Sequence, residues 1–164
     1  VASTKSGCYI QLNEQAKIIA CEGTTTESVV VTAREIIDLC KEVFWLGVPK
    51  DIEYSELTAS MIVSESDNPL EKIKRFAGNS YNVFNEILGD ETAGYSIRIA
   101  PKNRVPTDRT WFDISITPRI SSPEREYHVE TVFRHAEDVE SVLDFTSKLD
   151  EKIVAIINKM GGQR

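Results

Sequence analysis

The sequence is poor in the residue types that most catalytic and metal sites require. It has two histidines and three cysteines in 164 residues, with no CxxC pair and no Cys/His cluster. Zinc sites need such clusters, so we expect no metal site. The GxGxxG, GxSxG, HExxH, Walker and EF-hand patterns are missing too, and we expect no cofactor. These absences favour a protein that is not an enzyme.

Long apolar runs and an excess of positive charge are also missing. No apolar run approaches about 18 residues, so we expect no membrane span. Residues 1–7 lack the apolar core of a signal peptide. The net charge is −7, from 19 basic and 26 acidic residues. Nucleic acids and anionic membranes bind basic surfaces, so neither is an expected partner.

The three cysteines are odd in number and lie in segments with apolar patterning, at Cys8, Cys21 and Cys40. We expect small buried side chains in a reducing compartment, and therefore a cytoplasmic protein. The length suits one domain with a sizeable core over residues 1–164. Because the chain does not begin with Met, we expect a trimmed chain or a domain cut from a longer protein.

The segment Glu137–Met160 has the strongest helical pattern. Its apolar positions recur at spacings of three and four and cover about half of the helix circumference. They are Val139, Val142, Thr146, Leu149, Ile153, Ile156 and Met160, with Leu143, Phe145, Val154 and Ile157 beside them. An arc this wide indicates a helix lying across a sheet, since a coiled coil needs only a narrow seam. Asp150 falls inside this arc, either at its edge or buried with a partner.

Six strands and two further helices are predicted upstream. The segments are a hairpin over Gly7–Cys21, a helix over Thr24–Gly47, a strand over Ile52–Val63, a helix over Asn68–Gly89 that Gly78 kinks or splits, and strands over Tyr95–Ala100, Trp111–Thr117 and Glu126–Arg134. In the hairpin, a turn at Asn13–Gln15 places Ile10 opposite Ile18 and Leu12 opposite Ala16. Val43 belongs to the buried stripe of the first helix, and Trp45 is interpreted as a rim residue of the core.

The predicted fold class is therefore α+β. We expect one domain with a mainly antiparallel sheet of about six strands, in the order β-β-α-β-α-β-β-β-α. The three helices lie chiefly on one face of the sheet, and the long C-terminal helix covers the last three strands.

The last three strands allow a register to be predicted. Keeping the apolar residues in phase places Ile97 opposite Ile114, and Ile114 opposite Val129. A slip of two residues would keep the faces and change the partners. The other face then carries Arg98 beside Asp113, Asp113 beside Glu130, and Ser115 beside His128, with Trp111 at one end.

This polar face is the candidate site, with Trp111, Arg98, Asp113, Glu130 and His128 as its residues. Three interpretations stay open: a surface ladder of ion pairs, a binding surface or subunit interface, and acid/base chemistry by the paired carboxylates and the histidine. A weaker candidate is an anion site in the loop 101–110, where Lys102, Arg104 and Arg109 are basic against an acidic chain.

The sequence leaves three functions in competition. The first is a non-catalytic protein–protein binding or assembly module that self-associates or binds a protein partner, with an exposed Trp111 as anchor. The alternative for Trp111 is that its own chain covers it, for example through the loop 101–110. The second is a carrier of a small apolar ligand, with a cavity between the sheet and the C-terminal helix. The third is an acid/base enzyme using Asp113, Glu130 and His128. Missing catalytic motifs favour the first.

Overall fold

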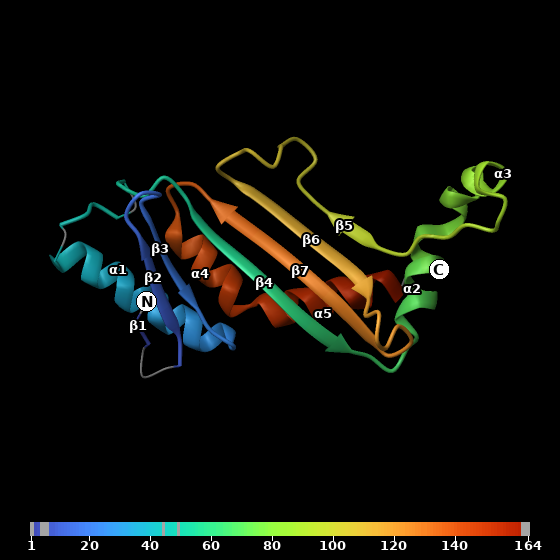
Figure 1. Ribbon diagram of the computed structural model, residues 1–164, viewed down its shortest axis with the longest axis horizontal. Coiled ribbons are helices and arrows are strands. Elements are labelled where there is room, and N and C mark those ends of the chain that lie inside the picture. The colour runs from blue at the N-terminus through green and yellow to red at the C-terminus, as the bar shows by residue number, and fades with distance from the viewer. Residues whose placement is uncertain (1, 4–6, 44, 49, 162–164) are drawn as a thin grey trace. The chain divides into compact units, whose positions relative to one another are not determined.

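The computed structural model describes residues 2–3, 7–43, 45–48 and 50–161 (Figure 1). The chain divides into two compact units. The first unit comprises residues 1–55 and 135–150, and the second comprises residues 56–134 and 151–164. Each unit has a sheet and helices of its own.

The first unit contains a small antiparallel sheet in the order β1-β2-β3. Its strands are β1 (Ala2–Ser3), β2 (Tyr9–Asn13) and β3 (Ile18–Glu22). The predicted hairpin is present, but its register was wrong. Ile10 lies opposite Cys21 and Leu12 lies opposite Ile19.

The register differs because the turn begins one residue later than expected and is one residue longer than the expected three. Four residues, 14–17, connect the strands. The Asn13 carboxamide accepts a hydrogen bond from the Ala16 N–H at 3.0 Å, and Lys17 adopts a left-handed φ of 54°. An Asn side chain that closes a turn on its own backbone in this way is a common device of longer hairpin loops. The second strand is therefore displaced by three residues, which exchanges its two faces.

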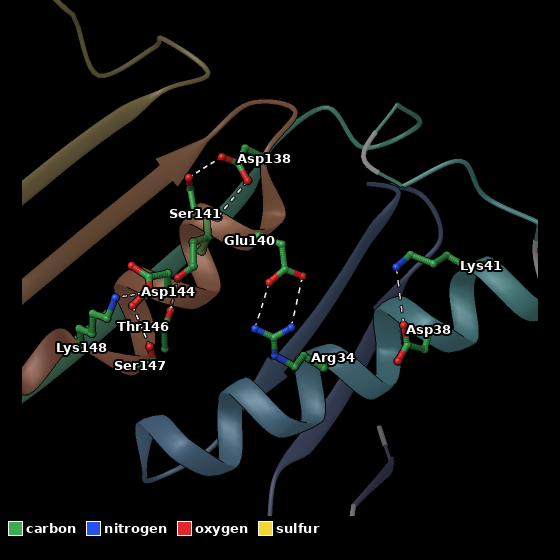
Figure 2. A network of polar contacts seen from close by, with 11 residues as sticks. Arg34, Asp38, Lys41, Asp138, Glu140, Ser141, Asp144, Thr146, Ser147 and Lys148 are labelled. Atoms are coloured by element: carbon green, nitrogen blue, oxygen red, sulfur yellow. Dashed lines mark hydrogen bonds and ion pairs between the residues drawn. The ribbon is translucent and has the colours of Figure 1, made fainter.

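Two helices of the first unit are joined by an ion pair. α1 (Thr26–Val43) and α4 (Val139–Ser147) carry Arg34 and Glu140, whose Nη2 and Oε2 atoms lie 3.0 Å apart. Figure 2 shows this pair together with the cap of α4, where Asp138 accepts hydrogen bonds from the N–H and hydroxyl of Ser141. The Ser141 bonds hold the pKa of Asp138 below its ordinary value of 3.8. An acidic N-cap satisfies the free N–H groups of the first turn.

The C-terminal helix is two helices, so the single helix over Glu137–Met160 was wrong. α5 (Leu149–Gly161) follows α4 after Lys148, whose ψ of 13° departs from helical geometry. The hydroxyls of Thr146 and Ser147 donate to the carbonyls of Val142 and Asp144, at 2.7 and 2.9 Å. Such back-bonding bends helices and offers the backbone an alternative to the regular ladder. Asp150, left open by the sequence, is exposed.

The second unit contains a four-stranded antiparallel sheet in the order β4-β7-β6-β5. Its strands are β4 (Ser55–Ser64), β5 (Ile97–Ile99), β6 (Trp111–Pro118) and β7 (Glu126–His135). The Glu65 N–H donates to the Arg125 carbonyl at one end, and Arg134 pairs with Glu56 at the other. These two contacts show that β4 and β7 run in opposite directions.

One face of this sheet forms the core of the second unit. Ile114, Ile116, Tyr127 and Val129 are buried on it, as the period-two pattern predicts. α5 runs behind the strands in Figure 1, and its Ile153, Ile157 and Met160 are buried. The prediction that Val142 and Leu149 are buried is also confirmed, since their exposed fractions are 6% and 1%.

The predicted second helix is split at Gly78. α2 (Pro69–Ala77) is capped by Asn68, whose side chain accepts from the Glu71 N–H, and it ends where Gly78 takes a φ of 59°. A 3-10 helix, η1 (Gly78–Phe84), and a single turn, α3 (Asn85–Leu88), follow. The α+β class with antiparallel sheets is thus confirmed, whereas one six-stranded sheet with three helices is wrong.

Candidate functional site

The polar face of the four-stranded sheet exists, but its residues pair differently from the prediction. Ile97 lies opposite Ile116, and Ile116 lies opposite Val129. This is the slip of two residues that keeps the faces and changes the partners. The faces were predictable because alternation is a local property, whereas the register depends on the lengths of the connecting loops.

The slip separates the two carboxylates of the candidate site. Asp113 lies opposite Val132, and Glu130 lies opposite Ser115, so the predicted pairing of Asp113 with Glu130 was wrong. The predicted contact of Asp113 with Arg98 is present, although Arg98 lies diagonally across and not directly opposite. Arg98 Nε is 2.8 Å from Oδ1 and 3.0 Å from Oδ2, and Nη2 also contacts Oδ2. The Arg98 side chain is 70% exposed, so water screens this ion pair.

His128 lies opposite Thr117, so its predicted pairing with Ser115 was wrong. Its Nε2 atom is 3.0 Å from the Ser60 hydroxyl on β4. A serine beside a histidine is the first half of a nucleophilic site. The strands that hold the pair use their N–H groups in sheet hydrogen bonds, however, and an acyl-transfer site also needs free N–H groups for the oxyanion. The geometry therefore fits a cross-strand hydrogen bond better than a nucleophile.

Trp111 is buried, which overturns its predicted role as an exposed anchor. Its exposed fraction is 8%. Its partner across the strands is Arg134, whose Nη1 donates to the carbonyls of Pro106 and Asp108 at 3.3 and 3.2 Å. Arg134 thereby holds the loop 101–110 beside the Trp111 end of β6. The indole is part of the folded structure of this unit.

The loop 101–110 also contains the weak anion candidates. Arg104 Nη1 donates to the Thr110 carbonyl at 3.2 Å, and the Asp108 carboxylate accepts from the Val105 N–H at 3.0 Å. Lys102 and Arg109 are exposed. An acidic side chain inside the loop offsets part of its positive charge, and the anion site stays a prediction.

Of the two tryptophans, Trp45 is the one exposed to solvent. Its exposed fraction is 86%, so its interpretation as a rim residue of the core was wrong. It adopts a left-handed φ of 54°, a region that costs a non-glycine residue about 1–2 kcal/mol. The backbone around it is held in place: the Leu46 N–H donates to the Cys40 carbonyl, and the Gly47 N–H donates to the Asp51 carboxylate at 2.7 Å.

Other exposed apolar side chains lie close to Trp45 in the sequence, at and just after the end of α1. Leu39 and Val43, one helical turn apart, are 53% and 58% exposed, and Leu46 is 38% exposed. Val43 was expected in the buried stripe of α1, and that expectation was wrong. We call Leu39, Val43, Trp45 and Leu46 the Trp45 patch. Single exposed apolar residues are common, so the group is of interest because it includes a tryptophan and is a candidate binding surface.

A buried ion pair lies in the core of the second unit. Lys72 Nζ on α2 is 2.6 Å from Glu65 Oε1, with side-chain exposures of 5% and 19%. Tyr127 is fully buried beside them, and its burial, followed by the charge of Glu65, raises the pKa of its hydroxyl above the ordinary 10.0. α5 passes close to this group, because a β-carbon on Gly161 would lie 2.7 Å from Lys72 Cε.

Sequence reasoning missed this buried group. Lys72 is three residues from Pro69 and next to Ile73, the other buried positions of α2. A lysine stem can cover apolar surface with its charge in water, so the spacing alone does not indicate a buried ammonium. Only the position of Glu65 at the end of β4 shows that the charge is paired inside.

The described residues offer no assembled metal or redox site. Among residues 2–3, 7–43, 45–48 and 50–161, no group of three His, Cys, Asp or Glu side chains is placed to hold a metal ion. Cys8 and Cys40 are buried, Cys21 is half-buried, and all three are thiols that form no disulfide. Burial, and then the neighbouring Cys8, raise the pKa of the Cys21 thiol, which lowers its reactivity. None of the described helices has both the length and the low charge of a membrane span.

Comparison with known proteins finds none that is similar to this chain. No family model, no curated protein and no solved structure matches this chain. The geometry of its own residues is therefore the basis for any functional statement. That geometry contains no assembled catalytic group among the described residues, and it contains an exposed, strained tryptophan.

Proposed function

We propose that this chain is a protein-binding module that associates through the Trp45 patch. The observation that carries the proposal is the 86% exposure of Trp45 in a left-handed backbone conformation. Backbone strain tends to be kept where function requires it, and tryptophan is the residue type most enriched among interface anchors. The proposal keeps the predicted class of function and moves its anchor from Trp111 to Trp45.

The energetics support an anchor of this kind. Covering a tryptophan side chain removes roughly 150–250 Å² from water, which at about 25 cal/mol per Å² gives roughly 4–6 kcal/mol of transfer free energy. Association consumes part of this in lost translational and side-chain freedom. Leu39, Val43 and Leu46 would extend the contact around the indole. The neighbouring charges Asp38 and Lys41 lie 3.6 Å apart and offset one another.

The experiment is analytical ultracentrifugation of the wild type and Trp45→Ala from low to high micromolar concentration. We expect the wild-type mass to rise with concentration and the variant to stay monomeric, because the variant loses the anchor. Both should melt at nearly the same temperature, since an exposed side chain contributes little to the fold. Ile120→Ala is the matched control, because Ile120 is 90% exposed and lies outside the patch.

A second readout follows Trp45 itself. In a Trp111→Phe background, Trp45 is the sole fluorophore of its type, and association should lower its quenching by acrylamide as concentration rises. A wild type that stays monomeric, with unchanged quenching, would reject self-association. Photo-crosslinking in cells would then test for a different protein partner, with the crosslinker placed at position 45 or at position 120. Equal crosslinking from the two positions would reject the patch as a binding surface.

A further inference from the structure

The segment 78–94 of the second unit forms a compact projection, which we call the arm. It consists of η1, α3 and the return chain to β5, and Figure 1 shows α3 away from the strands. Thr92 closes the arm: its N–H and hydroxyl both donate to the Asn85 side-chain oxygen, at 2.9 and 2.7 Å, and its hydroxyl also contacts the Tyr81 carbonyl. Gly89 ends α3 in a left-handed conformation.

The return chain packs directly against the base of the arm. Gly94 is buried, and a β-carbon there would lie 2.6 Å from Ala77 Cβ and 2.9 Å from Tyr81 Cε2. The close approach requires glycine at this position. The arm is therefore held in one shape by its own hydrogen bonds and by this contact.

The arm places its large apolar side chains in solvent. All residues of η1 and α3 are described, and none of them is buried. Val83, Phe84, Ile87 and Leu88 are 70%, 45%, 78% and 68% exposed. Their spacing of one and four residues gathers them on one side of the helical turn. A shaped apolar surface that its own chain leaves uncovered fits a binding role.

The charges around this surface have one sign. Glu86, Asp90 and Glu91 are exposed in the arm, and the sequence between Phe76 and Ile97 contains no Lys, Arg or His. An arm-to-arm contact between two copies would bring six carboxylates together. Like charges across an interface oppose association. A second copy is therefore a poor occupant.

We infer that the arm packs its apolar side chains against an amphipathic helix of a different protein, whose apolar face has a rim of Lys or Arg. The basic rim would pair with Glu86, Asp90 and Glu91 and would speed the encounter. The occupant is an amphipathic helix because its apolar face matches the exposed apolar side chains of the arm and its basic residues match the acidic neighbours. This surface is independent of the Trp45 patch and adds a second binding site to the proposed function.

The test uses two synthetic helical peptides as probes, with the same leucine face and with either Lys or Glu at the flanking positions. Binding to the full chain is measured by fluorescence anisotropy at low and high salt. We expect the Lys peptide to bind, about tenfold more weakly at the higher salt because the charges are screened. We expect the Glu peptide not to bind. Equal binding of both peptides would overturn the inference that the partner surface has a basic rim.

Three variants locate the binding. Ile87→Ser/Leu88→Ser should weaken the Lys peptide by about tenfold or more, since two anchors lose apolar area. Glu86→Gln/Asp90→Asn/Glu91→Gln should weaken it and flatten the salt dependence. The matched control Glu14→Gln/Glu22→Gln/Glu124→Gln changes the net charge equally at exposed positions outside the arm and should bind normally. Equal losses in the arm and control charge variants would show non-specific attraction and overturn the inference.

Two further outcomes would also overturn it. A melting temperature that falls by several degrees in Ile87→Ser/Leu88→Ser would show that the arm packs within its own chain. A sedimentation mass that this variant lowers would make a second copy the occupant. Trp45→Ala separates the two proposals, because it should leave peptide binding unchanged even where it abolishes self-association. Failure of one proposal therefore does not imply failure of the other.

Discussion

The buried pair of Lys72 and Glu65 offers a sharp test of the fold of the second unit. Lys72→Met keeps most of the apolar stem and removes the ammonium. The Glu65 carboxylate, whose side chain is 19% exposed, then loses the cation 2.6 Å from one of its oxygens. Removing one partner of a buried pair costs about 3–5 kcal/mol, because the other charge stays buried without compensation. The partial exposure of Glu65 places our expectation near the lower end, at about 3 kcal/mol.

The double variant Lys72→Met/Glu65→Gln should recover part of this loss. It removes both charges, so no uncompensated carboxylate remains, and replacing both partners of a buried pair is often nearly neutral. We expect the double variant to be more stable than the sum of the single variants by about 1–3 kcal/mol. Urea denaturation at neutral pH measures all three free energies of unfolding. Fluorescence and circular dichroism should give coincident transitions, which a chain of two units needs to show.

Lys74→Met is the matched control on the same helix. Lys74 pairs with Glu71 at 2.9 Å, but the two side chains are 40% and 56% exposed. Exposed pairs contribute at most about 1 kcal/mol, so this variant should be nearly neutral. If Lys72→Met destabilises the protein no more than Lys74→Met, the Lys72 ammonium is not buried. Additive single variants would show that Lys72 and Glu65 do not interact.

Three further predictions concern the tryptophan, the tyrosine and the helix cap. Trp45→Gly should leave the melting temperature unchanged or raise it by a few degrees, because glycine relieves the left-handed strain, whereas a core residue would lower it. The pKa of Tyr127 is raised by folding, so the stability that Tyr127 contributes is complete below pH 10 and is lost as the pH rises further. Urea unfolding at pH values from 10 upward should show this loss, and Tyr127→Phe should abolish this pH dependence. The pKa of Asp138 is lowered, so its stabilising effect holds at neutral pH and is lost as the pH falls below 3.8. Asp138→Ala should lower the melting temperature at pH 7 and reduce the further fall of the melting temperature in acid.

Local patterns in the sequence predicted the elements well. The alternation over Trp111–Thr117 and Glu126–Arg134 placed the apolar residues of β6 and β7 on one face, and the structure buries that face. Asn68 and Pro69 predicted the start of α2 to the residue, because capping is decided by neighbours in the chain. Gly78 was the expected place for a break, and α2 ends there.

The errors arose where the hydrogen-bond or charge partner of a single side chain decides the outcome. The hairpin register depends on a side chain closing the turn, which added one residue to the loop. The break at Lys148 depends on whether the Thr146 and Ser147 hydroxyls bind the backbone or point away, and periodicity contains no information on this. The pairing of Lys72 with Glu65 requires two elements to meet, so neither residue is unusual in its own segment.

The two tryptophans illustrate why the candidate site moved. Trp111 stands on the polar side of β6, and by alternation alone it should meet solvent. Its burial accompanies the contact of Arg134, on another strand, with the carbonyls of the loop 101–110. Trp45 follows the last residue of α1, where the chain turns back on Cys40 and the buried face of the helix no longer continues. A periodic pattern predicts which face of an element a residue occupies. Whether the residue is exposed depends on which other segments of the chain cover that face. The proposed binding surface therefore lies at Trp45, where the chain leaves a large apolar side chain uncovered at a left-handed position.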